Sequence, residues 1–160
     1  MKQFIAGCFA LLFSTLAFAK DYNIGKCPAG PAGTPINCNF ISNAVNGATF
    51  SDTMTFDLGT WTEWYGTLVY SASQGVQVSG AKGNAPCSGR SCGTGQTYEI
   101  VIDSATIGGV PLNPPATGYA WTLPINLAYG LHTVAVTGHA TGALWYARWT
   151  AQVHGIVYTQ

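Results

Sequence analysis

FSDTMTFDL, residues 50–58, alternates apolar and polar side chains along its length. This period of two predicts a β-strand with one buried face, on which Phe50, Met54 and Phe56 lie together. Asp52 falls on the same apolar face. A buried carboxylate is costly unless it is paired, hydrogen-bonded or bound to a cation. We therefore expect the fold to supply a specific partner for Asp52.

The sequence around this strand repeats a pattern of strands and turns. Segments rich in Thr, Val, Ile, Tyr and Trp are separated by Gly, Pro and Asn clusters, and no stretch has helical periodicity. Residues 81–95 form the longest expected loop. The expected strands are residues 49–58, 66–73, 75–79, 97–107, 119–123, 131–137 and 143–158. This pattern predicts an all-β protein, an antiparallel β-sandwich of the jelly-roll type.

The chain divides into three parts. Residues 1–19 have the features of a Sec-type signal peptide, with Lys2, an apolar core and an Ala-Phe-Ala cleavage signal directly before Lys20. Residues 20–45 are rich in Gly and Pro, which predicts an irregular N-terminal arm. Residues 46–160 are expected to form the sandwich domain. The sequence thus predicts a protein that is secreted, periplasmic or held at the cell surface, without insertion into the membrane.

Charge is scarce, since only 8% of the residues are Asp, Glu, Lys or Arg. Six basic side chains balance six acidic ones, and removal of Lys2 with the leader leaves a net charge near −1. Nucleic acids and anionic membranes require a basic patch, and the sequence has none. A weakly charged surface repels its neighbours poorly, which favours self-association.

Four cysteines remain after the expected cleavage, an even number that is typical of disulfides in an exported domain. Proximity in the sequence favours the pairs Cys27–Cys38 and Cys87–Cys92. The spacing does not match the Cys-x-x-Cys or His patterns of zinc sites. We therefore expect disulfides and no metal at these positions.

Two segments resemble a known family. GATFSDTMTF, residues 47–56, is similar to the strand that names the FxDxF family of exported PEP-CTERM proteins, and YGLHTVAVTG, residues 129–138, is similar to a later strand of that family. The aromatic strand around Trp145 is similar as well. Met54 replaces the second Phe of the family motif, and the sorting tail is missing. Asp-containing strands of this kind also occur in bacterial pre-peptidase C-terminal domains.

The resemblance implies a small surface-associated or matrix-associated protein of undefined activity. Because the sorting tail is missing, it also implies a chain that is released or held by contacts. In this family Asp52 would be an architectural carboxylate. Hydrogen bonds to N–H groups of a neighbouring strand would satisfy it, and a calcium ion is the weaker alternative, since no Asp-x-Asp-x-Asp-Gly loop supports one. We expect no other cofactor.

No pattern in the sequence favours catalysis. GRSCG, residues 89–93, fits the Gly-x-Ser-x-Gly motif but lacks the flanking strand and helix of a nucleophile elbow. Glu99 and Asp103 are expected on one strand face, too far apart for a retaining glycosidase pair. His132 is expected to be partly buried and hydrogen-bonded, and His139 to lie at a turn. We therefore expect no catalytic residues.

Aromatic residues are the best candidates for ligand binding, because sugars stack their C–H faces on exposed rings. The shared parity of Trp145 and Trp149 with alanines indicates that both are packed in the core. The candidate ligand-binding residues are Trp61, Trp64, Tyr65, Tyr146 and Arg148. The sequence therefore predicts an exported, non-catalytic β-sandwich that contacts an extracellular glycan, a surface protein or further copies of itself. A carbohydrate-binding module is the alternative, and a secreted hydrolase is a distant third.

Overall fold

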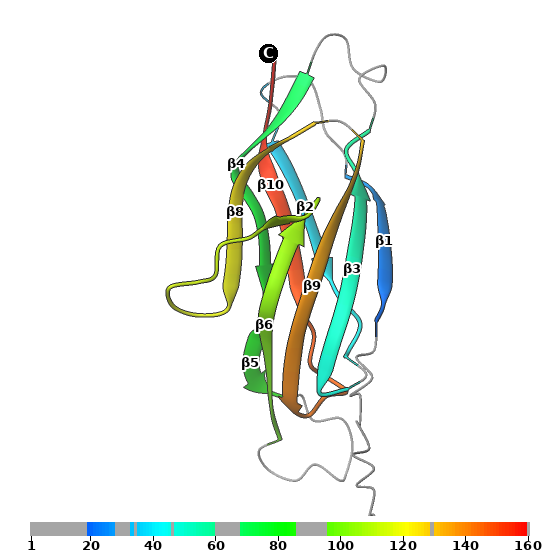
Figure 1. Ribbon diagram of the computed structural model, residues 1–160, viewed down its shortest axis with the longest axis vertical. Helices are drawn as coiled ribbons and strands as arrows, with labels where there is room; N and C mark the ends of the chain where they lie inside the picture. Colours follow the sequence, from blue (N-terminus) through cyan, green and yellow to red (C-terminus); the bar gives the residue numbers. More distant parts are fainter. Residues whose placement is uncertain are drawn as a thin grey trace, which may run out of the picture.

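The computed structural model describes residues 19–27, 33, 35–45, 47–59, 68–85, 96–128 and 130–159. Their strands form two sheets that face each other as layers (Figure 1). The all-β sandwich predicted from the sequence is confirmed, and the jelly-roll connectivity stays a prediction. Two expectations, the leader up to residue 18 and the Gly-x-Ser-x-Gly turn at 89–93, lie outside the described residues.

The first sheet has the strand order β1-β3-β9-β6-β5, with the short β7 paired to β6. Its strands are β1 (Asp21–Lys26), β3 (Thr49–Asp57), β9 (Leu131–Gly142), β6 (Thr97–Ile107), β5 (Ala81–Asn84) and β7 (Val110–Pro111). The second sheet has the order β2-β10-β4-β8. Its strands are β2 (Pro35–Ile41), β10 (Thr150–Thr159), β4 (Leu68–Ser79) and β8 (Ala120–Leu127). Neighbouring strands are antiparallel except β1 and β3, which are parallel.

The core lies between the sheets, and β3 contributes its alternating face as expected. Phe50, Met54 and Phe56 are all buried, and so is Asp52, whose exposed fraction is 2%. Across from Phe50, β9 carries Gly138. A Cβ atom there would lie 2.4 Å from the ring of Phe50, so the glycine makes room for the aromatic side chain.

The N-terminal segment, residues 20–45, differs from the expected irregular arm. It forms β1 on the first sheet and β2 on the second. Its apolar side chains alternate inward, which the Gly-rich and Pro-rich composition obscured. These are Tyr22, Ile24, Ile36, Cys38 and Phe40. The segment is therefore part of both sheets.

The disulfide between Cys27 and Cys38 is confirmed and links the end of β1 to the middle of β2. It therefore joins the two sheets covalently. Cys27 also donates its backbone N–H to the carbonyl of Asp57 at 2.8 Å, which extends the contact between the first segment and β3. The second expected pair, Cys87–Cys92, lies outside the described residues.

Several expected boundaries change in the structure, among them the ends of β8 at Leu127 and β9 at Gly142. The strands expected at 66–73 and 75–79 are a single strand, β4, in which Gly75 adopts a positive φ of 89° at an irregularity of the pairing. After Gly80 the chain continues directly as β5, so residues 81–84 are a strand rather than the start of a loop. A Cβ atom on Gly80 would lie 2.2 Å from the carbonyl oxygen of Ile100, and only glycine permits this crossing between the sheets.

Candidate functional site

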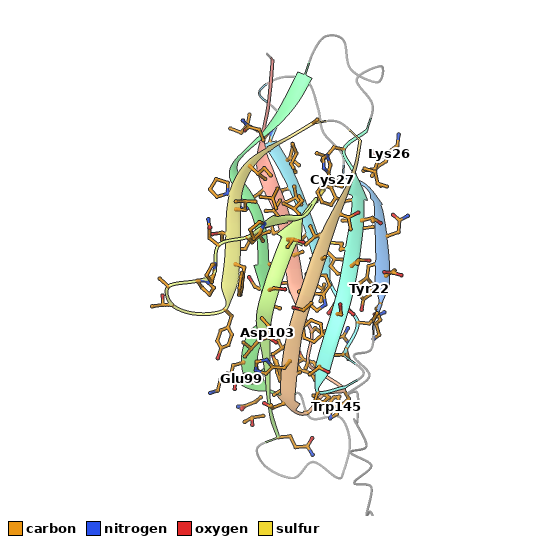
Figure 2. The ribbon with its side chains drawn as sticks, in the orientation of Figure 1. Tyr22, Lys26, Cys27, Glu99, Asp103 and Trp145 are labelled. Carbon is orange, nitrogen blue, oxygen red and sulfur yellow. A yellow bond between two sulfur atoms is a disulfide. The ribbon has the colours of Figure 1, made fainter. Side chains whose placement is uncertain are left out.

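A group of three aromatic rings, one exposed and two half-buried, lies where the chain turns from β9 to β10. Trp145 is 55% exposed, and its ring centroid is 5.9 Å from that of Tyr146. Tyr146 in turn meets Tyr98 of β6 edge-on, with centroids 5.0 Å apart. We call these three residues the aromatic cluster. Figure 2 shows Trp145 at the lower end of the sandwich.

A tight turn explains why Trp145 points outward. The backbone N–H of Tyr146 donates to the carbonyl of Ala143 at 3.0 Å, so the chain bends before β10 begins at Thr150. The expected continuous strand over residues 143–158 is therefore wrong in its first part, and its alternation does not hold there. The expectation that Trp145 packs in the core is wrong for this reason.

A shallow hollow lies beside the exposed ring. It is lined by Gln96, Thr97, Gly142, Ala143 and Trp145. Its polar groups are amide, hydroxyl and backbone groups, and none of its lining side chains is charged. Gly142 has a positive φ of 78°, and a Cβ atom there would lie 2.0 Å from the carbonyl oxygen of Thr97. The close approach of β9 to β6 at this end therefore depends on glycine.

The structure brings only part of the predicted ligand-binding set to this place. Tyr146 belongs to the aromatic cluster and is half-buried there. Arg148 is exposed, but its guanidinium donates to the backbone carbonyl of Ser42 at 3.2 Å and so holds a neighbouring segment. The remaining predicted residues, Trp61, Trp64 and Tyr65, lie outside the described residues.

Sequence reasoning missed two members of the cluster, Tyr98 and Trp145. A signal for Trp145 was present, because the isolated Gly142 in a strand pattern indicates an irregularity shortly before the aromatic segment. Nothing comparable marks Tyr98. It meets Tyr146 only because β6 pairs with β9, a contact that links distant parts of the sequence.

Asp52 forms a second polar site, inside the sandwich. The indole Nε1–H of Trp149 donates to its Oδ2 at 2.8 Å. The backbone N–H of Lys20 donates to its Oδ1 at 3.0 Å. Each carboxylate oxygen thus has an N–H donor. The donors are an indole and the backbone N–H of Lys20 just before β1, and not the expected N–H groups of a neighbouring strand.

The position of Trp149 is fixed from several directions. Its backbone N–H donates to the Ser42 hydroxyl at 3.0 Å, and its carbonyl accepts the Ser42 N–H at 2.9 Å. Its ring packs at an angle on Phe40, with centroids 5.2 Å apart, and edge-on to Tyr22 at 5.9 Å. The indole donor is therefore held in place toward Asp52 by a fully buried ring.

Burial raises the pKa of the Asp52 carboxyl above its ordinary value, while the hydrogen bonds from Trp149 and Lys20 act in the opposite direction. The negative form therefore carries a desolvation cost that its hydrogen bonds offset only in part. Both oxygens are occupied by N–H donors, and calcium would need oxygen ligands around the same atoms. This geometry favours a structural role for Asp52 over calcium binding.

The other acidic groups on β6 serve separate partners. Glu99 accepts a hydrogen bond from the Tyr119 hydroxyl at 2.9 Å, which raises the pKa of that phenol. Asp103 contacts the imidazole Nδ1 of His139 at 2.9 Å on the surface. A register shift between Ile102 and Ser104 interrupts the alternation between the two carboxylates. Figure 2 labels both residues at different heights along β6.

The histidines occupy different places. His132 is half-buried, with Nε2 2.8 Å from the carbonyl of Ala128 and its ring 5.4 Å from that of Phe56. Its expected partly buried, hydrogen-bonded state is confirmed. His139 lies within β9 and not at a turn, because that strand continues to Gly142.

Among the described residues, no three His, Cys, Asp or Glu side chains gather into a group that could hold a metal ion. The same part of the chain contains no helix long and apolar enough to cross a membrane. No protein-family model, no curated protein and no solved structure matches the chain.

Proposed function

We propose that this protein is an exported, non-catalytic β-sandwich that acts by contact at the cell surface or in the extracellular matrix. The aromatic cluster is its contact site. The observation that carries the proposal is the exposed ring of Trp145, which lies beside an uncharged polar hollow. The resemblance of residues 47–56 to the FxDxF strand is in keeping with such a role.

A glycan is the ligand that this chemistry favours. Sugar rings present C–H patches that pack on an aromatic face, and their hydroxyls pair with neutral amides and hydroxyls. Trp145 offers the face, and Gln96 and Thr97 offer the polar groups. The ring of Trp145 is also held in position, because it packs on Tyr146, which in turn packs on Tyr98.

The polar groups elsewhere support a non-catalytic role. Glu99, Asp103 and Asp52 are each engaged by a different partner, and none of them lines the hollow beside Trp145. Acid–base catalysis on a glycan would need two carboxyl groups facing one cleft.

Titration of the purified protein with a panel of polysaccharides, followed by tryptophan fluorescence, tests the glycan contact. We expect a spectral shift with at least one polysaccharide, and about a tenfold or greater loss of affinity in Trp145→Ala. Leu131→Ala is the matched control, because Leu131 is also exposed, at 69%, but lies at the start of β9. No shift with any polysaccharide would count against glycan binding.

Retention tests the wider role. A protein that acts in the matrix should be found with the cells or in assemblies, and Trp145→Ala should move it into the medium. A parent protein that is found only as a monomer in the medium would contradict the proposed surface role.

A further inference from the structure

Among the described residues, no cationic group contacts the Asp52 carboxylate directly. Its two hydrogen-bond donors, the Lys20 backbone N–H and the Trp149 indole, are both neutral. The nearby cationic groups donate elsewhere: the Lys20 Nζ to the carbonyl of Ala44 at 2.7 Å, and Arg148 to Ser42. Buried charges in proteins are ordinarily paired, so within the described part of the chain this carboxylate lacks the cationic partner that its burial favours.

The residue that meets Asp52 is also the first one after the predicted leader. Lys20 directly follows the Ala-Phe-Ala cleavage signal at 17–19. Its backbone is held on both sides, because the N–H donates to Asp52 and the carbonyl accepts the N–H of Thr53 at 2.8 Å. Ala19, by contrast, is exposed. The Ala19–Lys20 bond, the predicted cleavage site, thus joins an exposed residue to one whose backbone is held by two hydrogen bonds.

We propose that Asp52 is the receptor for the mature N-terminus. Hydrolysis of the Ala19–Lys20 bond adds one water, leaves a carboxylate on Ala19 and gives Lys20 a free α-amino group that takes up a proton. The nitrogen that donates to Asp52 at 3.0 Å then becomes an ammonium, and the neutral hydrogen bond becomes an ion pair. The proposal rests on the export part of the proposed function and is independent of glycan binding.

The pairing makes leader removal a step that stabilises the fold. Before cleavage, burial raises the pKa of Asp52, and the native state carries the cost of its charge. After cleavage, the positive charge on the Lys20 nitrogen favours the ionised form of the Asp52 carboxylate. β1 follows Lys20 directly, so the ion pair also fixes the start of the first strand.

The two forms have opposite pH dependence at this site. With a neutral amide at Lys20, the folded pKa of Asp52 is raised, so stability increases as the pH falls through that value. With an ammonium, each charge favours the other, so we expect the folded pKa of Asp52 to fall below its ordinary value and that of the α-amine to rise above its own. The contribution of the pair is then present between about pH 4 and pH 8, the ordinary ranges of the two groups. It is lost below and above this window.

Other charged groups around Asp52 are common to both forms. The Lys20 side chain lowers the pKa of Asp52 and Asp21 raises it. Asp52 and Arg148 act in opposite directions on the pKa of the buried Tyr22 phenol, which burial itself raises. Cleavage leaves these groups unchanged. A difference in stability between the uncleaved and cleaved chains is therefore due to the new ammonium on Lys20.

The first experiment compares the protein exported with its own leader and a chain that carries one extra Gly before Lys20. Mass spectrometry should show that the exported chain begins at Lys20. We expect its thermal midpoint to exceed that of the Gly-extended chain by about 3 °C or more near pH 6. The difference should shrink at pH 3 and at pH 10. A mature chain that begins elsewhere, or equal midpoints at pH 6, would overturn the proposal.

The second experiment measures acylation of the α-amine at pH 7, with the exposed Lys82 side chain as an internal reference. We expect the amine of the exported chain to react about tenfold more slowly than that of the Gly-extended chain. One unit of pKa changes the free amine fraction about tenfold. Asp52→Asn should restore rapid reaction, whereas Asp103→Asn, which removes an exposed carboxylate, should not. Equal rates in the parent and extended chains would contradict the ion pair.

Discussion

Trp145 and Trp149 are four residues apart and have opposite surroundings. Trp145 is 55% exposed at a turn, whereas Trp149 is fully buried and donates its indole N–H to Asp52. Both residues are tryptophans, so the turn at Ala143–Tyr146 determines that Trp145 is exposed and Trp149 is buried in the core. The pair therefore separates the two roles of tryptophan in this protein, ligand contact and internal hydrogen bonding.

Substitution of the two tryptophans by phenylalanine tests this separation. Trp149→Phe leaves one oxygen of the buried Asp52 without its donor, so we expect the free energy of unfolding to fall by about 2–3 kcal/mol. Trp145→Phe should change it by less than about 0.5 kcal/mol, as for other exposed positions. Urea unfolding followed by circular dichroism measures both. Equal losses would show that the indole N–H contributes little.

For the buried carboxylate, the sequence predicted the position of Asp52 but not its hydrogen-bond partners. Alternation along residues 50–58 was enough to place the carboxylate in the core. Its donors are 32 and 97 positions away in the chain, at Lys20 and Trp149. Local patterns carry no information about such distant contacts, which the pairing of whole strands decides.

The N-terminal segment shows how an element can be hidden by its composition. Glycine and proline predicted an irregular arm, but the segment contributes β1 and β2 to opposite sheets. The expected strand at 97–107 agrees with β6, because six of its eleven residues are β-branched and no Gly or Pro interrupts it. The sequence thus predicted the bounds of β3 and β6 well, but it divided β4 in two, began the last strand too early and missed the short strands β1, β2 and β5.

Removal of the disulfide tests the contribution of this segment. We expect Cys27→Ser with Cys38→Ser to lower the free energy of unfolding by about 2–3 kcal/mol, because the unfolded chain regains the freedom of the loop between them. Chemical denaturation of the double variant and the parent gives the difference. An unchanged midpoint would mean that β1 and β2 are held by their sheets alone.

Glycine substitutions test the fit between β3 and β9. Gly138→Ala would place a Cβ atom against the ring of Phe50 and the backbone of Val101, so we expect a loss of about 1–3 kcal/mol. Gly83→Ala is the matched control on β5. Its Cβ atom would meet only the outer end of the Tyr98 side chain, at 3.1 Å, and the change should stay within about 0.5 kcal/mol. Thermal unfolding of both variants distinguishes them.

The two sheets are connected along the chain as well as by side-chain packing. β4 belongs to the second sheet and continues through Gly80 into β5 of the first. The disulfide forms a second link between the layers. The two sheets are therefore joined covalently as well as by the core between them.

We therefore expect the domain to unfold as one unit. Transitions followed by far-ultraviolet circular dichroism, which reports strands, and by tryptophan fluorescence, to which the buried Trp149 contributes, should coincide. Two separated midpoints would show that the layers unfold independently, in conflict with the connection through Gly80.

The parallel pairing of β1 with β3 has a mechanical consequence. Figure 1 shows β1 running upward beside the upper part of β3, while the chain finishes at the upper end beyond β10. Tension between the start of β1 and this upper end would pull β1 along β3 and load their backbone hydrogen bonds in shear, all at once. Once β1 slid free, the Cys27–Cys38 bond would pass the load directly to β2. The parallel pair of β1 and β3, followed by the disulfide, would thus resist stretching along the long axis of the sandwich.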